Sequence, residues 1–168
     1  LRTALLVGCG LSFFGQLTGV NIVIYYGPTI LAEAGFPLGN ALQFQVGFGI
    51  VNFVFTLIAI WKIDRWGRRP LLLGGMAAVV AALAAAAILF PFSPATSLAI
   101  AAVLAVYVAC IAISICAVIW VLTPEIFPTR IRARAMSISA FTNWATNGAS
   151  ALLFPWYVSR MGMASGFW

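Results

Sequence analysis

Charged residues are scarce in this sequence, and histidine is absent. Nine basic and three acidic residues make up 7% of the 168 positions, whereas a soluble domain usually carries about 25% charged residues. So few charges cannot cover a surface that faces water, and we expect lipid to surround most of the chain. Without histidine, and without an acid inside the apolar runs, acid–base catalysis lacks its usual groups. The sequence therefore does not favour an enzyme.

Cysteine is also rare, and the positions of the three cysteines exclude two kinds of site. Cys9, Cys110 and Cys116 all lie inside apolar runs, where their spacing fits neither a metal site nor a disulfide framework. We therefore expect no metal and no cofactor. The net charge of +6 comes from short basic clusters between apolar runs. That pattern is typical of membrane-protein loops, so we do not expect a nucleic-acid partner.

Five long apolar runs account for most of the chain. Each is long enough, or nearly so, to cross a hydrocarbon core of about 30 Å as a helix. In lipid the backbone must bond within its own segment, and the runs lack the alternation of a membrane barrel. We expect spans at about residues 4–31, 42–63, 71–92, 98–122 and 136–158. The sequence thus predicts an all-α, polytopic transmembrane helical bundle that forms one domain over residues 1–168.

Two of the connections between these runs are strongly basic. Lys62–Pro70 carries four bases and Thr123–Ala135 carries three, whereas Arg160 stands alone near the end. Parity places both basic loops and Arg2 on one side of the membrane, and the positive-inside rule makes that side the cytoplasm. We expect a multi-pass protein of the plasma membrane, which is the inner membrane if the source is bacterial. Pro124 and Pro128 should end the fourth helix near the membrane face.

Neutral amides interrupt the apolar pattern inside the spans. Gln16, Asn21, Asn52, Asn143 and Asn147 can all donate to and accept from hydroxyl groups without a charge penalty. The alternative is that such amides hold helices together. Gln16 and Asn21 stand five apart, about 140° around an ideal helix, so one straight face cannot hold both. A glycine on either side of Gln16–Thr18 would let this helix unwind, as transporter helices do near a binding site.

Four motifs occur in a fixed order along the chain. They are Gln16–Asn21 followed by Tyr25 and Tyr26, then Asp64–Arg69, then Trp120 with Glu125–Pro128 and Arg132, and finally Asn143 with Trp144. Together they resemble the sugar porter family of the major facilitator superfamily, from its seventh helix to its eleventh and the start of the twelfth. The resemblance implies the carboxyl-terminal half-domain of a carrier.

The same resemblance implies roles for particular side chains. Sugar contacts would come from Gln16, Asn21, Asn52, Trp120 and Asn147. An outer gate would consist of Tyr25 and Tyr26. A cytoplasmic salt-bridge network would comprise Asp64, Arg65, Arg68, Arg69, Glu125 and Arg132. Two positions depart from the pattern: Gly15 replaces a first glutamine, and Cys116-Ala117 replaces a Gly-Pro pair.

The expected function is transport of a sugar or sugar-like polyol by alternating access. We expect the chain to be a fragment with five full spans, in which Gly166–Trp168 begins a further one. Its partners would be the sugar, the lipid bilayer and a missing amino-terminal half of the same carrier. No acid lies in the spans, so the sequence leaves open whether protons are cotransported. Alternatives are a major facilitator carrier of another small solute, or a non-transporting sensor or remnant.

Overall fold

A computed structural model of the chain describes residues 2–92 and 95–162. These residues form helices joined by short connections, with no strand in the described ranges. The α-helices are α1 Arg2–Leu17, α2 Val20–Glu33, α3 Leu38–Trp66, α4 Arg68–Leu89, α5 Ser97–Ile111, α6 Ala117–Ile126 and α7 Arg132–Met161. A 3₁₀ turn, η1 (Phe90–Phe92), follows α4, and a π-helical segment, η2 (Ala112–Cys116), joins α5 to α6. The all-α fold class is confirmed.

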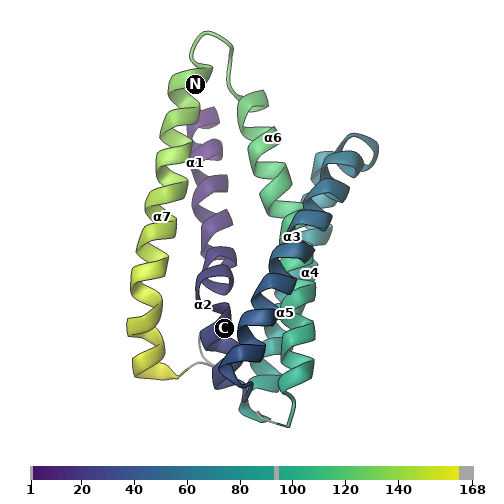
Figure 1. Cartoon of the computed structure of the whole chain (residues 1–168). Coiled ribbons are helices and arrows are strands. Elements are labelled where there is room, and N and C mark those ends of the chain that lie inside the picture. Colours follow the sequence, from purple (N-terminus) through teal and green to yellow (C-terminus); the bar gives the residue numbers. More distant parts are fainter. Residues whose placement is uncertain (1, 93–94, 163–168) are drawn as a thin grey trace.

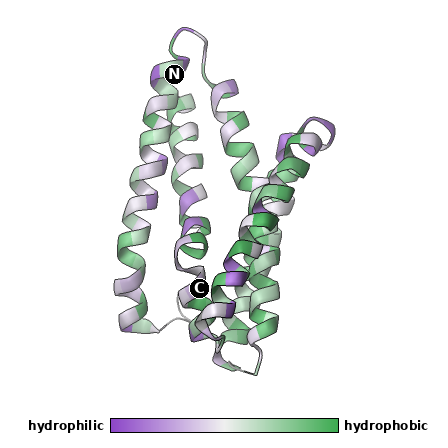
Figure 2. Ribbon diagram, in the orientation of Figure 1, coloured by the Kyte–Doolittle hydropathy of each residue, from purple (hydrophilic) through white to green (hydrophobic). Residues whose placement is uncertain are grey.

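Four helical stretches of the described chain are long and apolar enough to cross a membrane. They are Arg2–Glu33, Gly39–Trp66, Arg68–Phe92 and Ser97–Ile126. Figure 2 shows that apolar residues dominate along these helices, with hydrophilic residues gathered near the connections. Helix α7 has 30 residues, about 45 Å of helix, but it is more polar, so its crossing stays a prediction. The expected further span at 166–168 lies outside the described residues.

The helices are arranged so that the basic connections share one end of the bundle. In Figure 1 the N-terminal end, the α3–α4 connection and the α6–α7 connection all lie toward the top. Helix α1 packs mainly on α7, and α4 packs mainly on α5. The two basic loops therefore lie on one side, as parity requires, and the assignment of that side to the cytoplasm stays a prediction.

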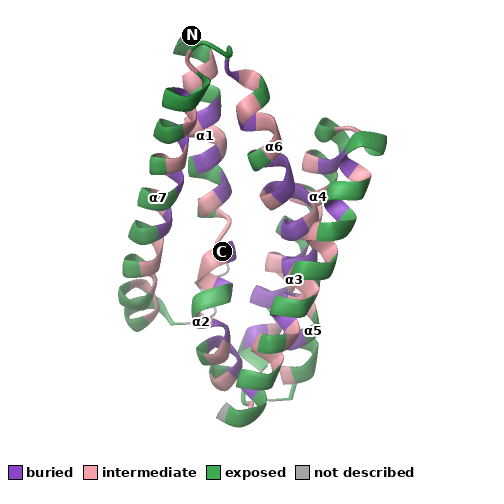
Figure 3. Ribbon diagram, turned by 45° about the horizontal axis from the view of Figure 1, so that its top comes forward, coloured by how far each residue is buried: buried purple, intermediate pink, exposed green. Residues whose placement is uncertain are grey.

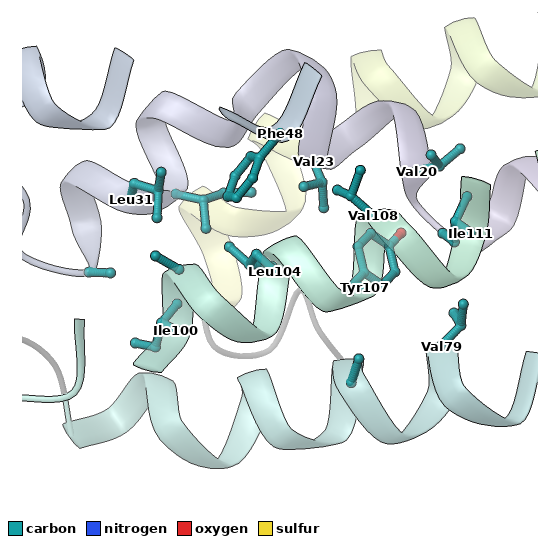
Figure 4. Close-up of a cluster of buried hydrophobic side chains, with 14 of the residues drawn as sticks. Val20, Val23, Leu31, Phe48, Val79, Ile100, Leu104, Tyr107, Val108 and Ile111 are labelled. Atoms are coloured by element: carbon teal, nitrogen blue, oxygen red, sulfur yellow. The ribbon is translucent and has the colours of Figure 1, made fainter. Parts of the chain in front are cut away.

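The apolar core is centred on α5. Its side chains Ile100, Leu104 and Tyr107 are fully buried and pack with residues of α2, α3 and α4, among them Val23 and Val79, as Figure 4 shows. Figure 3 shows that exposed residues dominate the outward faces of the other helices. Helix α5 is thus the inner element against which the neighbouring spans are held.

The first span is broken, as its glycines predicted. Helix α1 ends at Leu17 and α2 begins at Val20, with Gly19 at a φ of 82° in the left-handed region that glycine adopts without steric cost. Gly15 has a different role, because it lies inside α1 against Ile119 of α6, where any Cβ would collide. The departure at Gly15 therefore coincides with a close helix contact.

The fourth span ends differently from the prediction at one of its two prolines. Pro124 does not end the helix, since α6 continues to Ile126. A proline this close to the carboxyl end removes only one backbone hydrogen bond, so the last turn survives. Phe127 then becomes extended, at φ −91° and ψ 131°, which is the conformation that the following Pro128 favours. Pro128 is thus the residue that ends the span.

The π-helical segment η2 was not predicted. It lies immediately before Ala117, where the sequence departs from the Gly-Pro pair of the family that it resembles. Ser114 within it donates to the Cys110 carbonyl at 2.6 Å, and Gly75 of α4 lies directly against Ser114. A π-bulge inserts a residue into the helix and alters its direction. The span that runs from α5 through η2 into α6 is therefore irregular at this point, although no proline lies there.

Candidate functional site

A chain of hydrogen-bonded amides lies where α1 gives way to α2. Asn21 Nδ2 donates to Gln16 Oε1 at 2.7 Å, and Gln16 Nε2 donates to Asn143 Oδ1 of α7 at 3.0 Å. The break at Thr18–Gly19 allows this arrangement, since an unbroken helix would point the first two side chains about 140° apart. The structure thus joins two sequence-predicted residues with a third amide that the sequence also singled out.

Helix α7 contributes a second amide one turn later. Asn147 is buried, with 6% of its surface exposed, and its Nδ2 donates to the hydroxyl of Tyr25 at 3.3 Å. Asn143 and Asn147 therefore present a polar strip of α7 to α1 and α2. An amide has two donors and an acceptor oxygen with two lone pairs, so these bonds leave capacity for a hydroxyl-bearing ligand.

The other two expected sugar contacts lie apart from this chain. Asn52 of α3 accepts from Thr56 Oγ1 on its own helix and lines a hollow of about 340 Å³ with Ile24 and Gln45. Trp120 of α6 is half exposed and borders a separate hollow of about 230 Å³. No hydrogen bond in the described structure links either residue to the amide chain, so a single common cavity stays a prediction.

The expected gate tyrosines contact α7 in different ways. Tyr25 is 52% exposed, and its hydroxyl accepts the long bond of 3.3 Å from Asn147. Tyr26 is half-buried, and its hydroxyl donates to the carbonyl of Ala151 at 2.9 Å. That carbonyl has no helical N–H partner, because Pro155 stands four residues later and has no amide hydrogen. Tyr26 thus satisfies an acceptor that the proline leaves free.

Two further side chains act in the same way, and sequence reasoning missed both. Gln45 Nε2 donates to the carbonyl of Ile24, which lies four residues before Pro28. Tyr107 Oη donates to the carbonyl of Thr18 at the helix break, at 2.7 Å. Prolines in the sequence do mark free carbonyls, which is a usable signal. The partners could not be read, because Tyr107 lies 89 residues from Thr18.

The basic end of the bundle holds one ion pair between the two basic loops. Arg68 Nη2 lies 2.6 Å from Glu125 Oε1, and both side chains are about two-fifths exposed. The expected contact between loops is therefore present.

The rest of the expected network is not assembled. Within residues 2–92 and 95–162 no ion pair involves Asp64, Arg65, Arg69 or Arg132. Arg65 instead stacks over the ring of Trp61 at 4.7 Å, and Arg132 Nε donates to the Phe127 carbonyl at 3.3 Å. Cation–π and backbone contacts thus take up two of the expected arginines.

Comparison with known proteins places this geometry in context. A family model described as "Sugar (and other) transporter" matches residues 1–168. The D-xylose-proton symporter-like 2 protein of Arabidopsis thaliana is 36% identical over 152 residues, which cover 90% of this chain and 30% of the plant protein. The glucose facilitated diffusion protein of Zymomonas mobilis is 37% identical over 152 residues, covering 90% of this chain and 32% of that protein.

A solved structure agrees with these relatives. The crystal structure of a double tryptophan mutant of XylE superimposes with a TM-score of 0.88 at 30% identity, over 98% of this chain and 36% of XylE. The chain thus spans about a third of the length of the proteins that it matches. The similarity extends over almost all of the chain, including the amide chain and both basic loops.

Proposed function

We propose, since the chain belongs to the sugar transporter family of the major facilitator superfamily, that it forms the carboxyl-terminal half-domain of a carrier for a sugar or sugar-like polyol. It is a multi-pass membrane protein, and its relatives are transporters rather than enzymes. The half-domain would cover residues 1–168, with α7 as its fifth span. We place the carrier in the plasma membrane, with the basic loops in the cytoplasm.

The observation that carries this proposal is the amide chain at the break in the first span. Asn21, Gln16 and Asn143 are neutral, linked by bonds of 2.7 and 3.0 Å, and drawn from three helices. Such a set can donate to and accept from sugar hydroxyls with no charge to desolvate. An organic acid would need a cation in the interior of a span, whereas the five spans expected from the sequence contain only Lys62, at the very end of the second.

The remaining substrate contacts are assigned by the family resemblance. Asn147 extends the amide chain along α7, while Asn52 and Trp120 line two separate hollows. In a complete carrier a second half would close the site, and these side chains would meet a sugar held between the halves. An indole such as that of Trp120 offers an apolar face to a sugar ring.

Contacts at the two ends of the bundle would gate transport. Tyr25 and Tyr26 connect α2 to α7 and would close the outer side. The Arg68–Glu125 pair joins the two basic loops and would hold the inner ends of the helices together. A contact made in only one transport state stabilises that state over the other, which is what alternating access requires.

Coupling to protons is a finer part of the proposal. The name of the plant relative describes a proton symporter, and that of the Zymomonas relative describes facilitated diffusion. The three acids of this chain, Glu33, Asp64 and Glu125, all lie at helix ends. A carboxylate that couples transport to protons would therefore belong to the amino-terminal half.

A substrate panel tests the proposed function. Cells that express the carrier containing this chain would be offered labelled pentoses, hexoses, inositol and, as comparison solutes, organic acids. We expect saturable uptake of at least one sugar or polyol and none of the acids. Uptake of an acid without uptake of any sugar would support the alternative of another small solute, and an absence of all uptake would support a sensor or remnant.

A further inference from the structure

The cytoplasmic end of α3 carries a cluster of two indoles and two cations that takes no part in the Arg68–Glu125 pair. We propose that this cluster, made of Trp61, Lys62, Arg65 and Trp66, binds the phosphate of an anionic membrane lipid. The Lys62 Nζ lies 4.9 Å from the ring centre of Trp61 and 4.6 Å from that of Trp66. The Arg65 guanidinium lies 4.7 Å from the ring centre of Trp61. The four side chains therefore form one interleaved stack.

The stack lies on one outward face of the helix. At about 100° per residue its four members cover an arc of about 140°, and both indoles are about three-fifths exposed. Ile63, which points away from the centre of this arc, is buried at 5% exposure. The acid Asp64 lies beyond the edge of the arc and forms no ion pair in the described part of the chain. The face is thus cationic and aromatic, without a carboxylate of its own.

The stack lies near the end of α3, at a position that matches the depth of the lipid headgroups. Helix α3 has 29 residues, about 44 Å at 1.5 Å per residue, whereas the hydrocarbon core is about 30 Å thick. At least one end of the helix must therefore leave the hydrocarbon, and the last turns are the ones that carry charges, at Lys62, Asp64 and Arg65. Tryptophan prefers this interfacial layer, where its ring is half in contact with lipid. The stack would lie beside lipid phosphates rather than in open solvent.

The charges of the stack need a partner that the described protein does not supply. Lys62 and Arg65 form no ion pair there, and a cation–π contact does not give the N–H groups of a cation a hydrogen-bond acceptor. These N–H groups can donate to phosphate oxygens. The same end of the bundle carries eight bases against two acids, a local excess that favours an anionic over a zwitterionic lipid. The structure therefore supplies the donors, the apolar ring faces and the field that such a lipid needs.

Lipid binding can be measured directly on the purified carrier that contains this chain. The carrier in detergent would be titrated with phosphatidylglycerol, with phosphatidylcholine of the same acyl chains, and with soluble glycerol phosphate. Native mass spectrometry would count the molecules retained. We expect selective retention of phosphatidylglycerol, and a loss of about ten- to thirtyfold in its affinity when Lys62→Gln is combined with Arg65→Gln.

Two matched double variants distinguish a specific lipid site from general electrostatic attraction. Arg130→Gln with Arg134→Gln removes the same charge from exposed positions in the other basic loop and should change the affinity less than twofold. Trp61→Leu with Trp66→Leu keeps both cations and should still weaken retention severalfold.

Three results would overturn the proposal: equal losses of affinity from the two arginine-containing pairs, no effect of the tryptophan pair, or equal binding of phosphatidylcholine. So would binding of glycerol phosphate as tight as that of the lipid. Circular dichroism would confirm that each variant keeps its helix content, and the tryptophan pair supplies the test if the charge pair does not fold.

Discussion

Gln16 is the residue on which the proposed sugar site depends most. Its amide accepts from Asn21 and donates to Asn143, so it links the broken first span to α7. Replacing Gln16 by Ala removes one hydrogen-bonding partner and leaves the other amides unpaired, at a cost of about 1–3 kcal/mol. We expect the apparent affinity for sugar to fall about five- to hundredfold, measured by uptake at increasing sugar concentration.

A control on the neighbouring helix makes the Gln16 result specific. Thr142 precedes Asn143, is partly exposed, and its hydroxyl donates to the Ile138 carbonyl of its own helix. Thr142→Ala should leave sugar affinity unchanged within about twofold. An equal loss of affinity in both variants, or a Gln16→Ala carrier with normal affinity, would show that the amide chain is only structural.

Tyr26 offers a second test at the level of single atoms. Its hydroxyl is the partner of the Ala151 carbonyl that Pro155 leaves free. Tyr26→Phe should therefore lower the free energy of unfolding by about 1–3 kcal/mol, which can be followed as the midpoint of thermal unfolding in detergent. In a Pro155→Ala background the new amide hydrogen can bond to that carbonyl, so the same change should cost clearly less. Equal costs in the two backgrounds would rule out this pairing.

For single residues, the sequence predicted which types of side chain form the site better than it predicted which partners they bond to. Gln16, Asn21 and Asn143 could be singled out because amides are conspicuous in apolar runs. The bond from Tyr26 to Ala151 joins residues 125 apart, and no local pattern encodes such a pairing. Arg65 was expected in the salt-bridge network, yet its side chain stacks on the indole of Trp61. Competition between an aromatic ring and a carboxylate is decided by three-dimensional distances, which a motif does not contain.

The break between α1 and α2 is the element that gives the first span its shape. Gly19 has a φ of 82°, and a Cβ there would meet nothing closer than 3.7 Å. Gly19→Ala should therefore act through backbone strain alone, at a cost of about 1–2 kcal/mol. We expect a lower midpoint of thermal unfolding and weaker sugar uptake, because the Gln16–Asn21 bond depends on this bend.

Gly10 provides the matched substitution for this element. It lies in α1 without a positive φ, and a Cβ would have no neighbour within 4 Å. Gly10→Ala should be neutral or slightly stabilising, since alanine is the better helix former. A Gly19→Ala protein as stable and active as Gly10→Ala would show that the left-handed residue is not needed for the site.

Helices were easier to predict than their irregularities. The expected spans at 42–63 and 98–122 lie within Leu38–Trp66 and Ser97–Ile126 of the structure, because length and apolarity alone dictate a helix in lipid. The break at Gly19 was foreseeable from its glycine. The π segment at 112–116 was not, since no proline or glycine marks it, and a tight contact with Gly75 of α4 accompanies it.

For the molecule as a whole, the Arg68–Glu125 pair should bias one transport state. The pair is about two-fifths exposed, so its contribution is modest, on the order of 0–1 kcal/mol. Glu125→Gln should shift the ratio of inward to outward states by up to about fivefold, with little effect on the midpoint of unfolding. The accessibility of single cysteines at the two gates measures this ratio.

Glu33 is the natural comparison for the inner pair. It is an exposed acid at the carboxyl end of α2, at the opposite end of the bundle. Glu33→Gln removes the same charge and should leave the state ratio unchanged. A Glu125→Gln carrier with the wild-type ratio would argue that the pair only holds the loops in place.

The sequence pattern predicted which end of the bundle each loop lies at, but not how the helices pack on one another. Counting spans placed Lys62–Pro70 and Thr123–Ala135 at one end, and the structure has both connections there. The hollows beside Asn52 and Trp120 are separate in the structure, although the resemblance predicted one shared site. The sequence of these helices alone could not place the two residues relative to each other, because that distance depends on how α3 and α6 pack.

The central claim is that these helices are one half of a sugar carrier. Its most direct test is the flux of labelled sugar into proteoliposomes, measured for the 168-residue chain alone and for the carrier that contains it. Alternating access moves one half against the other around a site at their interface. We expect saturable flux, competed by unlabelled sugar, from the carrier and none from the chain alone. Saturable sugar flux from the 168 residues by themselves, or a carrier that moves no sugar, would contradict the central claim.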